Sequence, residues 1–248
     1  MSFPPSILIL TATGSRREID LKDIKDVCVV IQARLNSERV PQKMIRPFAD
    51  SSLFEIGVKK ILNSRIIPKE NFYVSVGEPE LIDIAEKHGV NVYHRSEKSA
   101  NAENSILDIY EWHDQLPYKY VVLVSACNPL LKTETIDGFF ERYLETDSQG
   151  LFAVMAKKQY FWDADGNMIG EWPMDQKLMN TKTMRTTYEA AHCLYASRLD
   201  VVKDGFWMDD KIPPAPELYT IEEQEALDVD YEWQFHVCEA EYKRVANE

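Results

Sequence analysis

The stretch VCVVIQARLNSERVPQKMIRPF, residues 27–48, joins a buried-strand pattern to a charged loop. Its first five residues form a continuous apolar run of strand length, which is typical of a strand in a parallel sheet covered on both faces. The run ends in a loop that carries Arg34, Arg39, Lys43 and Arg46. Because ligands of open α/β sheets bind beyond the carboxyl ends of the strands, the loop predicts a site for a small anion such as a polyphosphate.

The rest of the chain alternates strand and helix patterns. Apolar runs predict strands at 72–76, 90–93, 120–124, 151–156 and 190–196. Helical periodicity, a capping-box spacing at Ser52 and Glu55, and a Pro79 to Gly89 start and stop predict helices at 53–62, 79–88, 103–115, 133–145 and 231–245. This alternation predicts an α/β fold with a mostly parallel sheet and helices on both faces. The alternation of strand and helix patterns stops at about 157–190, where a hairpin turn at Asp165-Gly166 predicts a small protruding lobe.

Composition limits the possible partners. The chain has 248 residues, 45% of them hydrophobic, which is enough for one domain with a substantial core. Its 28 basic and 41 acidic residues give a net charge of −13, which disfavours nucleic acid or an anionic membrane as the partner. The apolar run at 7–10 is too short for a signal peptide or a membrane span, and the four cysteines lack metal-binding spacing. We therefore expect a cytoplasmic protein with an N-terminal arm at 1–26.

The cationic loop has two interpretations. It is either a solvated surface loop or a phosphate-binding loop. In the second interpretation Arg34 makes bidentate phosphate contacts, Ser37 and backbone N–H groups donate, and Lys43 supplies a point charge. A strand fixes the start of the loop and a capped helix follows it, so we favour phosphate binding.

An acidic pair precedes the last predicted helix. Asp228 and Asp230 are two residues apart in an extended segment, so their side chains are expected on one side. This arrangement suits Mg²⁺, which one or two carboxylates usually hold together with water and phosphate oxygens. The alternative is that one of the two carboxylates caps the helix beginning near Tyr231.

Together these segments resemble a known family, the cytidylyltransferases that include CMP-sialic acid synthetases and related spore-coat polysaccharide biosynthesis proteins. The resemblance runs from about residue 27 to 242. It is carried by Gln32-Ala33-Arg34-Leu35-Asn36-Ser37 with Pro41 and Lys43, by Asn128-Pro129-Leu130, and by Asp228-Val229-Asp230.

The resemblance implies a Rossmann-like nucleotidyltransferase domain (27–248) of the GT-A-like type, which dimerises through its small lobe. It implies transfer of CMP from CTP to a sialic-acid-like sugar acid, with Mg²⁺ as cofactor and release of pyrophosphate. The implied site comprises catalytic Arg34 and Lys43, nucleotide-binding Ala33, Arg34, Ser37, Lys43, Arg95 and Asn128, acceptor-binding Tyr188, Glu189 and His192, and the metal ligands Asp228 and Asp230.

Some positions depart from the family pattern. Residues 125–131 read SACNPLL where sialate-activating members have Gln-Pro-Thr-Ser-Pro-Leu-Arg, and Ala191-His192 replaces an Asn-Gly pair. Glu38 stands where the sialate enzymes often have lysine. The base and the acceptor therefore stay open, and a sugar phosphate or a phosphonate is an alternative acceptor. Because Asp228-Val229-Asp230 is also a D-x-D pattern, a metal-dependent glycosyltransferase is a further alternative, as is a binding protein without activity.

Overall fold

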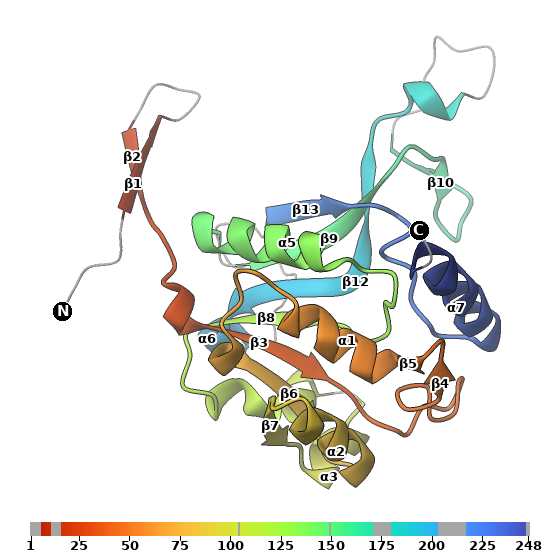
Figure 1. The fold of residues 1–248 in the computed structure, drawn as a ribbon. Helices are drawn as coiled ribbons and strands as arrows, with labels where there is room; N and C mark the ends of the chain where they lie inside the picture. Colours follow the sequence, from red (N-terminus) through yellow and green to blue (C-terminus); the bar gives the residue numbers. More distant parts are fainter. Residues whose placement is uncertain are drawn as a thin grey trace.

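The computed structural model describes residues 6–10, 16–103, 105–148, 150–170, 180–202 and 217–246. Its centre is a seven-stranded sheet in the order β13-β9-β12-β8-β3-β6-β7 (Figure 1). The strands are β3 (Val27–Gln32), β6 (Phe72–Val76), β7 (Asn91–His94), β8 (Tyr120–Val124), β9 (Gly150–Lys157), β12 (Thr187–Arg198) and β13 (Glu217–Ile221). Neighbouring strands are parallel except where β12 pairs with β8 and β9. The prediction of a mostly parallel α/β sheet is confirmed.

Strand β3 lies in the interior of the sheet, between β8 and β6, and both of its faces are apolar. Val27, Val29 and Ile31 belong to one buried cluster, and Cys28 and Val30 belong to a second one. The first cluster is covered by α1 (Leu53–Leu62), α2 (Pro79–Lys87), α5 (Thr133–Glu145) and α7 (Glu232–Ala246), and the second by η3 (Glu111–Asp114) and α6 (Leu199–Val202). Successive side chains of a strand point to opposite faces, so a continuous apolar run is buried on both.

The expected helix at 103–115 is wrong in its extent. The segment folds as α4 (Ile106–Ile109) and η3, and they join at Tyr110, whose φ of −107° and ψ of 47° end the first helix. Trp112 is fully buried, and its indole Nε1 donates to Gln32 Oε1 at 2.8 Å. Anchoring this side chain under β3 determines the path of the segment, and periodicity does not encode that contact.

The predicted hairpin within the lobe is confirmed. Strand β10 (Phe161–Trp162) pairs with β11 (Met168–Ile169), and Gly166 takes the left-handed φ of 84° that the turn requires. A 3₁₀ turn, η4 (Thr181–Thr183), precedes β12, while residues 171–179 lie outside the described part. That the lobe at 157–190 mediates a dimer stays a prediction.

At the N-terminus, β1 (Ser6–Leu10) and β2 (Arg16–Asp20) pair antiparallel in a two-stranded sheet of their own (Figure 1). Residues 1–5 and 11–15 lie outside the described part, and the division into an arm at 1–26 and a domain at 27–248 stays a prediction. The remaining short elements are η1 (Ile24–Asp26), β4 (Pro47–Phe48), β5 (Ser51–Ser52), η2 (Lys69–Asn71) and α3 (Glu97–Asn101).

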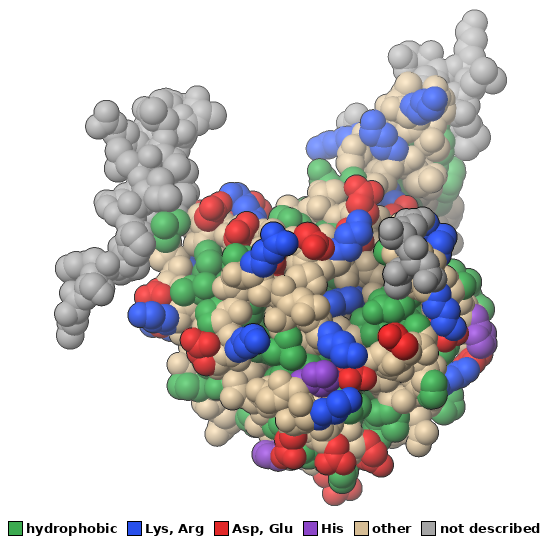
Figure 2. Space-filling model, in the orientation of Figure 1, with side chains coloured by type: hydrophobic (Ala, Val, Ile, Leu, Met, Phe, Trp, Pro, Cys, Tyr) green, Lys and Arg blue, Asp and Glu red, His purple; other side chains and the backbone are tan. Residues whose placement is uncertain are grey.

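The surface carries both signs of charge. Figure 2 shows Lys and Arg side chains interspersed with Asp and Glu on the visible face. Among the described helices, none combines the length and apolarity needed to cross a bilayer.

A carboxylate at the start of α1 ties this helix to α2. Glu55 accepts from Ser51 Oγ at 2.8 Å, and its Oε1 lies 2.8 Å from His88 Nε2 at the end of α2. The contact with His88 is the largest cause that lowers the pKa of Glu55, from its ordinary 4.5 to about 2. The fold therefore favours the carboxylate form.

Replacing the Glu55 carboxylate by an amide tests how much its charge contributes to the stability of the fold. We expect Glu55→Gln to lower the free energy of unfolding by about 2 kcal/mol at pH 7. A lowered pKa stabilises the fold above the ordinary value of 4.5, and the effect disappears as the pH falls toward 2, so the variant and the wild type should converge there. Urea unfolding at several pH values measures this, with Glu86→Gln on the exposed side of α2 as control. An equal difference at pH 3 and pH 7 would contradict the assignment.

Candidate functional site

The order of the strands places the candidate site. The chain runs from β3 outward through β6 and β7 and then returns to form β8 on the other side of β3. In such sheets a crevice opens at the carboxyl ends of the two strands where the direction of winding reverses. A cavity of about 610 Å³ lies there, lined by Gln32, Ala33, Arg34, Asn36, Ser37, Glu38, Arg39, Lys43, Met44, Arg95, Asn101, Ala102, Glu103, Ile109, Cys127 and Asp230. We call it the main cavity.

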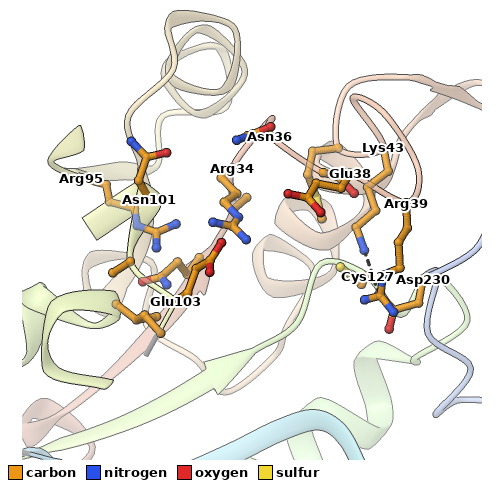
Figure 3. Close-up of a pocket in the computed structure, with 16 residues that line it drawn as sticks. Arg34, Asn36, Glu38, Arg39, Lys43, Arg95, Asn101, Glu103, Cys127 and Asp230 are labelled. Atoms are coloured by element: carbon orange, nitrogen blue, oxygen red, sulfur yellow. Dashed lines mark hydrogen bonds and ion pairs between the residues drawn. The ribbon is translucent and has the colours of Figure 1, made fainter. Parts of the chain in front are cut away.

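Lys43 connects the cationic loop to the acidic segment. Its Nζ donates to Val229 O at 2.6 Å and lies 3.4 Å from Asp230 Oδ1 (Figure 3). Burial lowers the pKa of Lys43, but Cys127 and the two nearby carboxylates raise it more, so the pKa lies above its ordinary value. The structure thus holds a charged lysine beside Asp230, where the sequence predicts that the two segments meet.

Arg39 lies on the same carboxylate, although sequence reasoning assigned it no role of its own. Its Nη2 is 2.8 Å from Asp230 Oδ1, and its guanidinium stands over the Tyr231 ring at 5.1 Å from the centroid. The side chain is half exposed and lines the main cavity. Its place in the cationic loop was the only signal in the sequence that could have identified it.

Two other arginines form the opposite wall of the cavity (Figure 3). Arg34 Nη1 donates to Ala100 O at 2.7 Å, and Arg95 donates to Ser99 through Nε to Oγ at 2.9 Å and through Nη2 to O at 2.8 Å. Burial and the charge of Arg34 lower the pKa of Arg95. Both guanidinium groups thus hold the segment after β7 in place and keep positive charge beside the cavity.

The backbone of the cationic loop is held by a carboxylate from the residue that precedes α2. Glu78 Oε1 accepts from Leu35 N at 2.7 Å, next to Arg34. Gly77 lies close to Arg95, because a Cβ at this glycine would meet Arg95 O at 2.8 Å. The close approach of these two strand ends therefore requires glycine here.

Asp228 lies deeper than Asp230. Its Oδ1 is buried and has no hydrogen-bond partner among the described residues. Burial is the main cause that raises the pKa of Asp228, and the charge of Asp230 raises it further; Lys43, Arg39 and His192 lower it. A buried carboxylate oxygen without a partner is costly unless something binds it.

This pair fits a hard divalent cation. The described residues contain no cluster of three or more His, Cys, Asp or Glu side chains arranged as metal ligands. Mg²⁺ does not need one, because water and substrate phosphates complete its shell around one or two carboxylates. The unpartnered Asp228 Oδ1 and the adjacent Asp230 are such a donor set.

The alternative that the acidic pair caps α7 receives no support. Gln234 Oε1 accepts from Asp230 N and from Tyr231 N, each at 2.8 Å, and so occupies the start of this helix. The acidic segment is instead pinned to the β8 loop by Val229 N, which donates to Cys127 O at 3.0 Å.

Only some of the other predicted site residues line the main cavity. Ala33 and Ser37 line the main cavity. Asn128 is buried behind it, donating from Nδ2 to Ala226 O at 3.0 Å, and is not among the lining residues. Tyr188 and Glu189 are exposed on the outer part of β12, where Glu189 pairs with Lys157. The structure therefore brings the loop cations together with Asp230, whereas Asp228, Asn128, Tyr188, Glu189 and His192 are not among the residues that line the main cavity.

Cys127 is a lining residue that sequence reasoning missed. It follows β8, and its Ser125 neighbour accepts from Cys127 N at 3.1 Å. Burial raises the pKa of the Cys127 thiol, and the neighbouring Lys43 counters this shift. Its position three residues after an apolar strand was the available signal, since the carboxyl ends of parallel strands share one edge.

Comparison with known proteins agrees with this geometry. The family model described as cytidylyltransferase matches residues 28–199. The chain belongs to the cytidylyltransferase family. The matched residues begin in β3 and include the cationic loop, the segment after β7 and the β8 loop, so the resemblance seen in the sequence is confirmed at the level of the family.

Two curated relatives match part of the chain at low sequence identity. The chain is 27% identical over 139 residues to the pseudaminic acid cytidylyltransferase of Campylobacter jejuni subsp. jejuni serotype O:23/36 (strain 81-176), covering 53% of this chain and 58% of the relative. It is 24% identical over 136 residues to the spore coat polysaccharide biosynthesis protein SpsF of Bacillus subtilis (strain 168), covering 54% and 56%. The chain thus spans a little over half the length of these curated relatives.

Solved structures share the fold. CMP:2-keto-3-deoxy-manno-octonic acid synthetase complexed with CTP has a TM-score of 0.64 at 10% identity, covering 89% of this chain and 99% of that chain. The 4-diphosphocytidyl-2C-methyl-D-erythritol synthase from Anaerococcus prevotii DSM 20548 has a TM-score of 0.63 at 12% identity, covering 88% and 96%. At these identities the likeness establishes the fold of a cytidylyltransferase.

Proposed function

We propose that this protein is a Mg²⁺-dependent cytidylyltransferase that transfers CMP from CTP to a sialic-acid-like sugar acid and releases pyrophosphate. The observation that carries the proposal is the contact of Lys43 with Val229 and Asp230, which joins the cationic loop to the acidic segment at the main cavity. Family membership and the sugar-acid name of the Campylobacter relative support the reaction class.

The cationic residues of the main cavity bind the triphosphate and stabilise charge during the reaction. The four cationic side chains that line it, Arg34, Arg39, Lys43 and Arg95, surround the space in which the triphosphate binds. Lys43 and Arg34 stabilise the negative charge that develops as pyrophosphate leaves. The acceptor oxygen forms a bond to the α-phosphorus, the bond from that phosphorus to pyrophosphate breaks, and the hydroxyl proton passes to water.

Asp228 and Asp230 hold the metal ion, which when bound neutralises charge on the phosphate oxygens. Arg39 and Lys43 also lie on Asp230. Where Asp230 holds the ion, these two side chains would bind phosphate oxygens instead of this carboxylate. In this way one carboxylate serves both to position the cations and to bind the ion.

A screen of nucleotides against acceptors tests the proposal. We expect pyrophosphate release with CTP, Mg²⁺ and a sugar acid such as pseudaminate or N-acetylneuraminate, and a loss of at least tenfold when EDTA replaces the metal. The panel includes the four nucleotides, sugar phosphates and phosphonates. Release only with another nucleotide, or only with a phosphate acceptor, would replace the proposed substrates; sugar transfer from an intact nucleotide sugar without pyrophosphate would replace the reaction itself.

A further inference from the structure

A lysine of α1 holds the backbone of the β8 loop, residues 125–132. Lys60 Nζ donates to Pro129 O at 2.7 Å and to Asn128 O at 3.0 Å. The backbone of the same lysine is also engaged, because Lys60 O accepts from Thr133 Oγ1 at 3.2 Å at the start of α5. A single residue thus ties α1 to two consecutive carbonyls of the loop and to the helix that follows it.

The fold disfavours the charge that these contacts use. Burial is the largest cause that lowers the pKa of Lys60, from its ordinary 10.5 to about 7, while Glu225 and the thiols of Cys193 and Cys238 counter it. Glu225 is buried and also accepts from Lys132 N at 3.0 Å, with Lys132 Nζ at 3.4 Å. An apolar side chain at position 60 would avoid the cost of burying an ammonium. Packing alone therefore does not explain this lysine.

The β8 loop is bonded to the segment that leads to the acidic pair. Cys127 O accepts from Val229 N at 3.0 Å, and Asn128 Nδ2 donates to Ala226 O at 3.0 Å. One of the two carbonyls that Lys60 holds belongs to this same asparagine. The path from the ammonium to the acidic pair thus runs through the backbone of the loop and these two hydrogen bonds.

Val229 lies between the two carboxylates and is held on both sides. Its N–H donates to Cys127 O in the β8 loop, and its carbonyl accepts from Lys43 Nζ at 2.6 Å in the cationic loop. These bonds fix the orientation of the peptide groups that carry Asp228 and Asp230. A displaced β8 loop would therefore change where both carboxylates point.

We propose that Lys60 is a positioning residue for the metal site: its ammonium fixes the β8 loop, and the loop holds Asp228 and Asp230 so that they bind one cation. This inference rests on the proposed function, which assigns the metal to these carboxylates. Lys60 does not line the main cavity, so it acts through the loop and not on the substrates. Loss of an outer group that orients metal ligands typically weakens metal affinity or activity by about 10–100-fold.

Metal binding tests the inference without turnover. Lys60→Met keeps the apolar stem and removes the ammonium. Electron paramagnetic resonance titration with Mn²⁺, which prefers the same oxygen ligands as Mg²⁺, should show a Kd about tenfold higher than in the wild type at pH 6. Lys60→Arg keeps the charge and several donors and should recover part of the affinity. Lys59→Met, which removes the exposed neighbouring lysine that pairs with Glu55, is the matched control and should bind Mn²⁺ like the wild type.

Kinetics should show the same pattern. The Mg²⁺ concentration for half-maximal pyrophosphate release should rise about tenfold in Lys60→Met. The KM for CTP at saturating Mg²⁺ should stay within about twofold, because the four cations that line the main cavity are unchanged. Similar rises in both quantities would contradict a role confined to the metal site.

A stability measurement shows whether the variant is folded and whether the ammonium is buried. The lowered pKa of Lys60 disfavours the fold below about pH 7 and ceases to do so as the pH rises toward 10.5. The unfolding temperature of Lys60→Met, relative to the wild type, should therefore be higher at pH 6 than at pH 9. A purely structural lysine would give this pH dependence with unchanged Mn²⁺ affinity. Lys60→Gln, which leaves a polar group beside the carbonyls, repeats the metal titration if Lys60→Met does not fold.

The outcomes separate this inference from the proposed function. In an active enzyme, wild-type Mn²⁺ affinity in folded Lys60→Met or Lys60→Gln would overturn only the inference, as would an equal loss in Lys59→Met. Failure of the wild type to release pyrophosphate with any acceptor would overturn the proposed function. The Mn²⁺ titration then decides the inference by itself: weaker binding by the Lys60 variants supports it, whereas equal binding, or no binding by the wild type, overturns it.

Discussion

Lys43→Ala should reduce CTP-dependent pyrophosphate release by a factor on the order of 10²–10³, because one preorganised charge facing the triphosphate is removed. The effect is expected in kcat more than in the KM for CTP, since Arg34 and Arg95 continue to line the cavity. Loss of Nζ also removes the contacts with Val229 and Asp230, so the acidic segment loses one of its anchors. Steady-state kinetics with saturating Mg²⁺ measures both parameters.

A methionine variant distinguishes charge from volume at this position. Lys43→Met keeps most of the apolar stem and should lose as much activity as the alanine variant, if the charge is what matters. The matched control is Lys119→Met, which removes an exposed lysine that pairs with Asp26 at the amino end of β8. Wild-type turnover in Lys43→Met, or an equal loss in Lys119→Met, would show that the assigned role is wrong.

Asp228→Asn should have opposite effects on activity and stability. The pKa of Asp228 is raised mainly by burial, so the folded state disfavours its charged form, and a neutral amide of the same shape should raise the thermal unfolding temperature in EDTA. Without the carboxylate the metal site keeps only Asp230. Metal-dependent pyrophosphate release should therefore fall by about 10² or more.

Measuring the unfolding temperature shows whether the loss of activity in Asp228→Asn comes from misfolding. A variant that loses activity because it is misfolded would unfold at a lower temperature, whereas the proposed metal ligand should lose activity while unfolding at a higher one. Asp83→Asn, on the exposed side of α2, is the control and should change neither quantity. Metal-dependent turnover at the wild-type rate in Asp228→Asn would show that this carboxylate is not a metal ligand.

Several elements follow from local patterns alone. The apolar run at the start of β3 predicts a central parallel strand, and the spacing of Ser52 and Glu55 predicts the start of α1, where Ser52 Oγ accepts from Glu55 N at 3.3 Å. The expected helix at 133–145 coincides with α5, and the expected helix at 231–245 differs from α7 by one residue at each end. These features depend on neighbours within a few residues, so the sequence specifies them directly.

Other features depend on distant partners and were not predictable. The helix expected at 103–115 is broken because Trp112 packs beneath β3 and donates to Gln32, which is 80 residues away in sequence. The strained backbone of His192 lies where the register between two long strands shifts, and a histidine at that position does not indicate it. Asn128 matches a family motif, yet the structure uses its side chain to hold a neighbouring loop.

The amino-acid pattern alone established most of the strands and helices, which loop is cationic, and where the acidic pair stands. It did not establish how these parts meet. Lys43 and Asp230 are 187 residues apart, and they touch because the strand order brings the β3 loop, the β8 loop and the segment before α7 to one edge of the sheet. Hydrophobic periodicity reflects the environment of each element separately, whereas the alignment of carboxyl ends depends on which strands pair, and only the folded chain decides this.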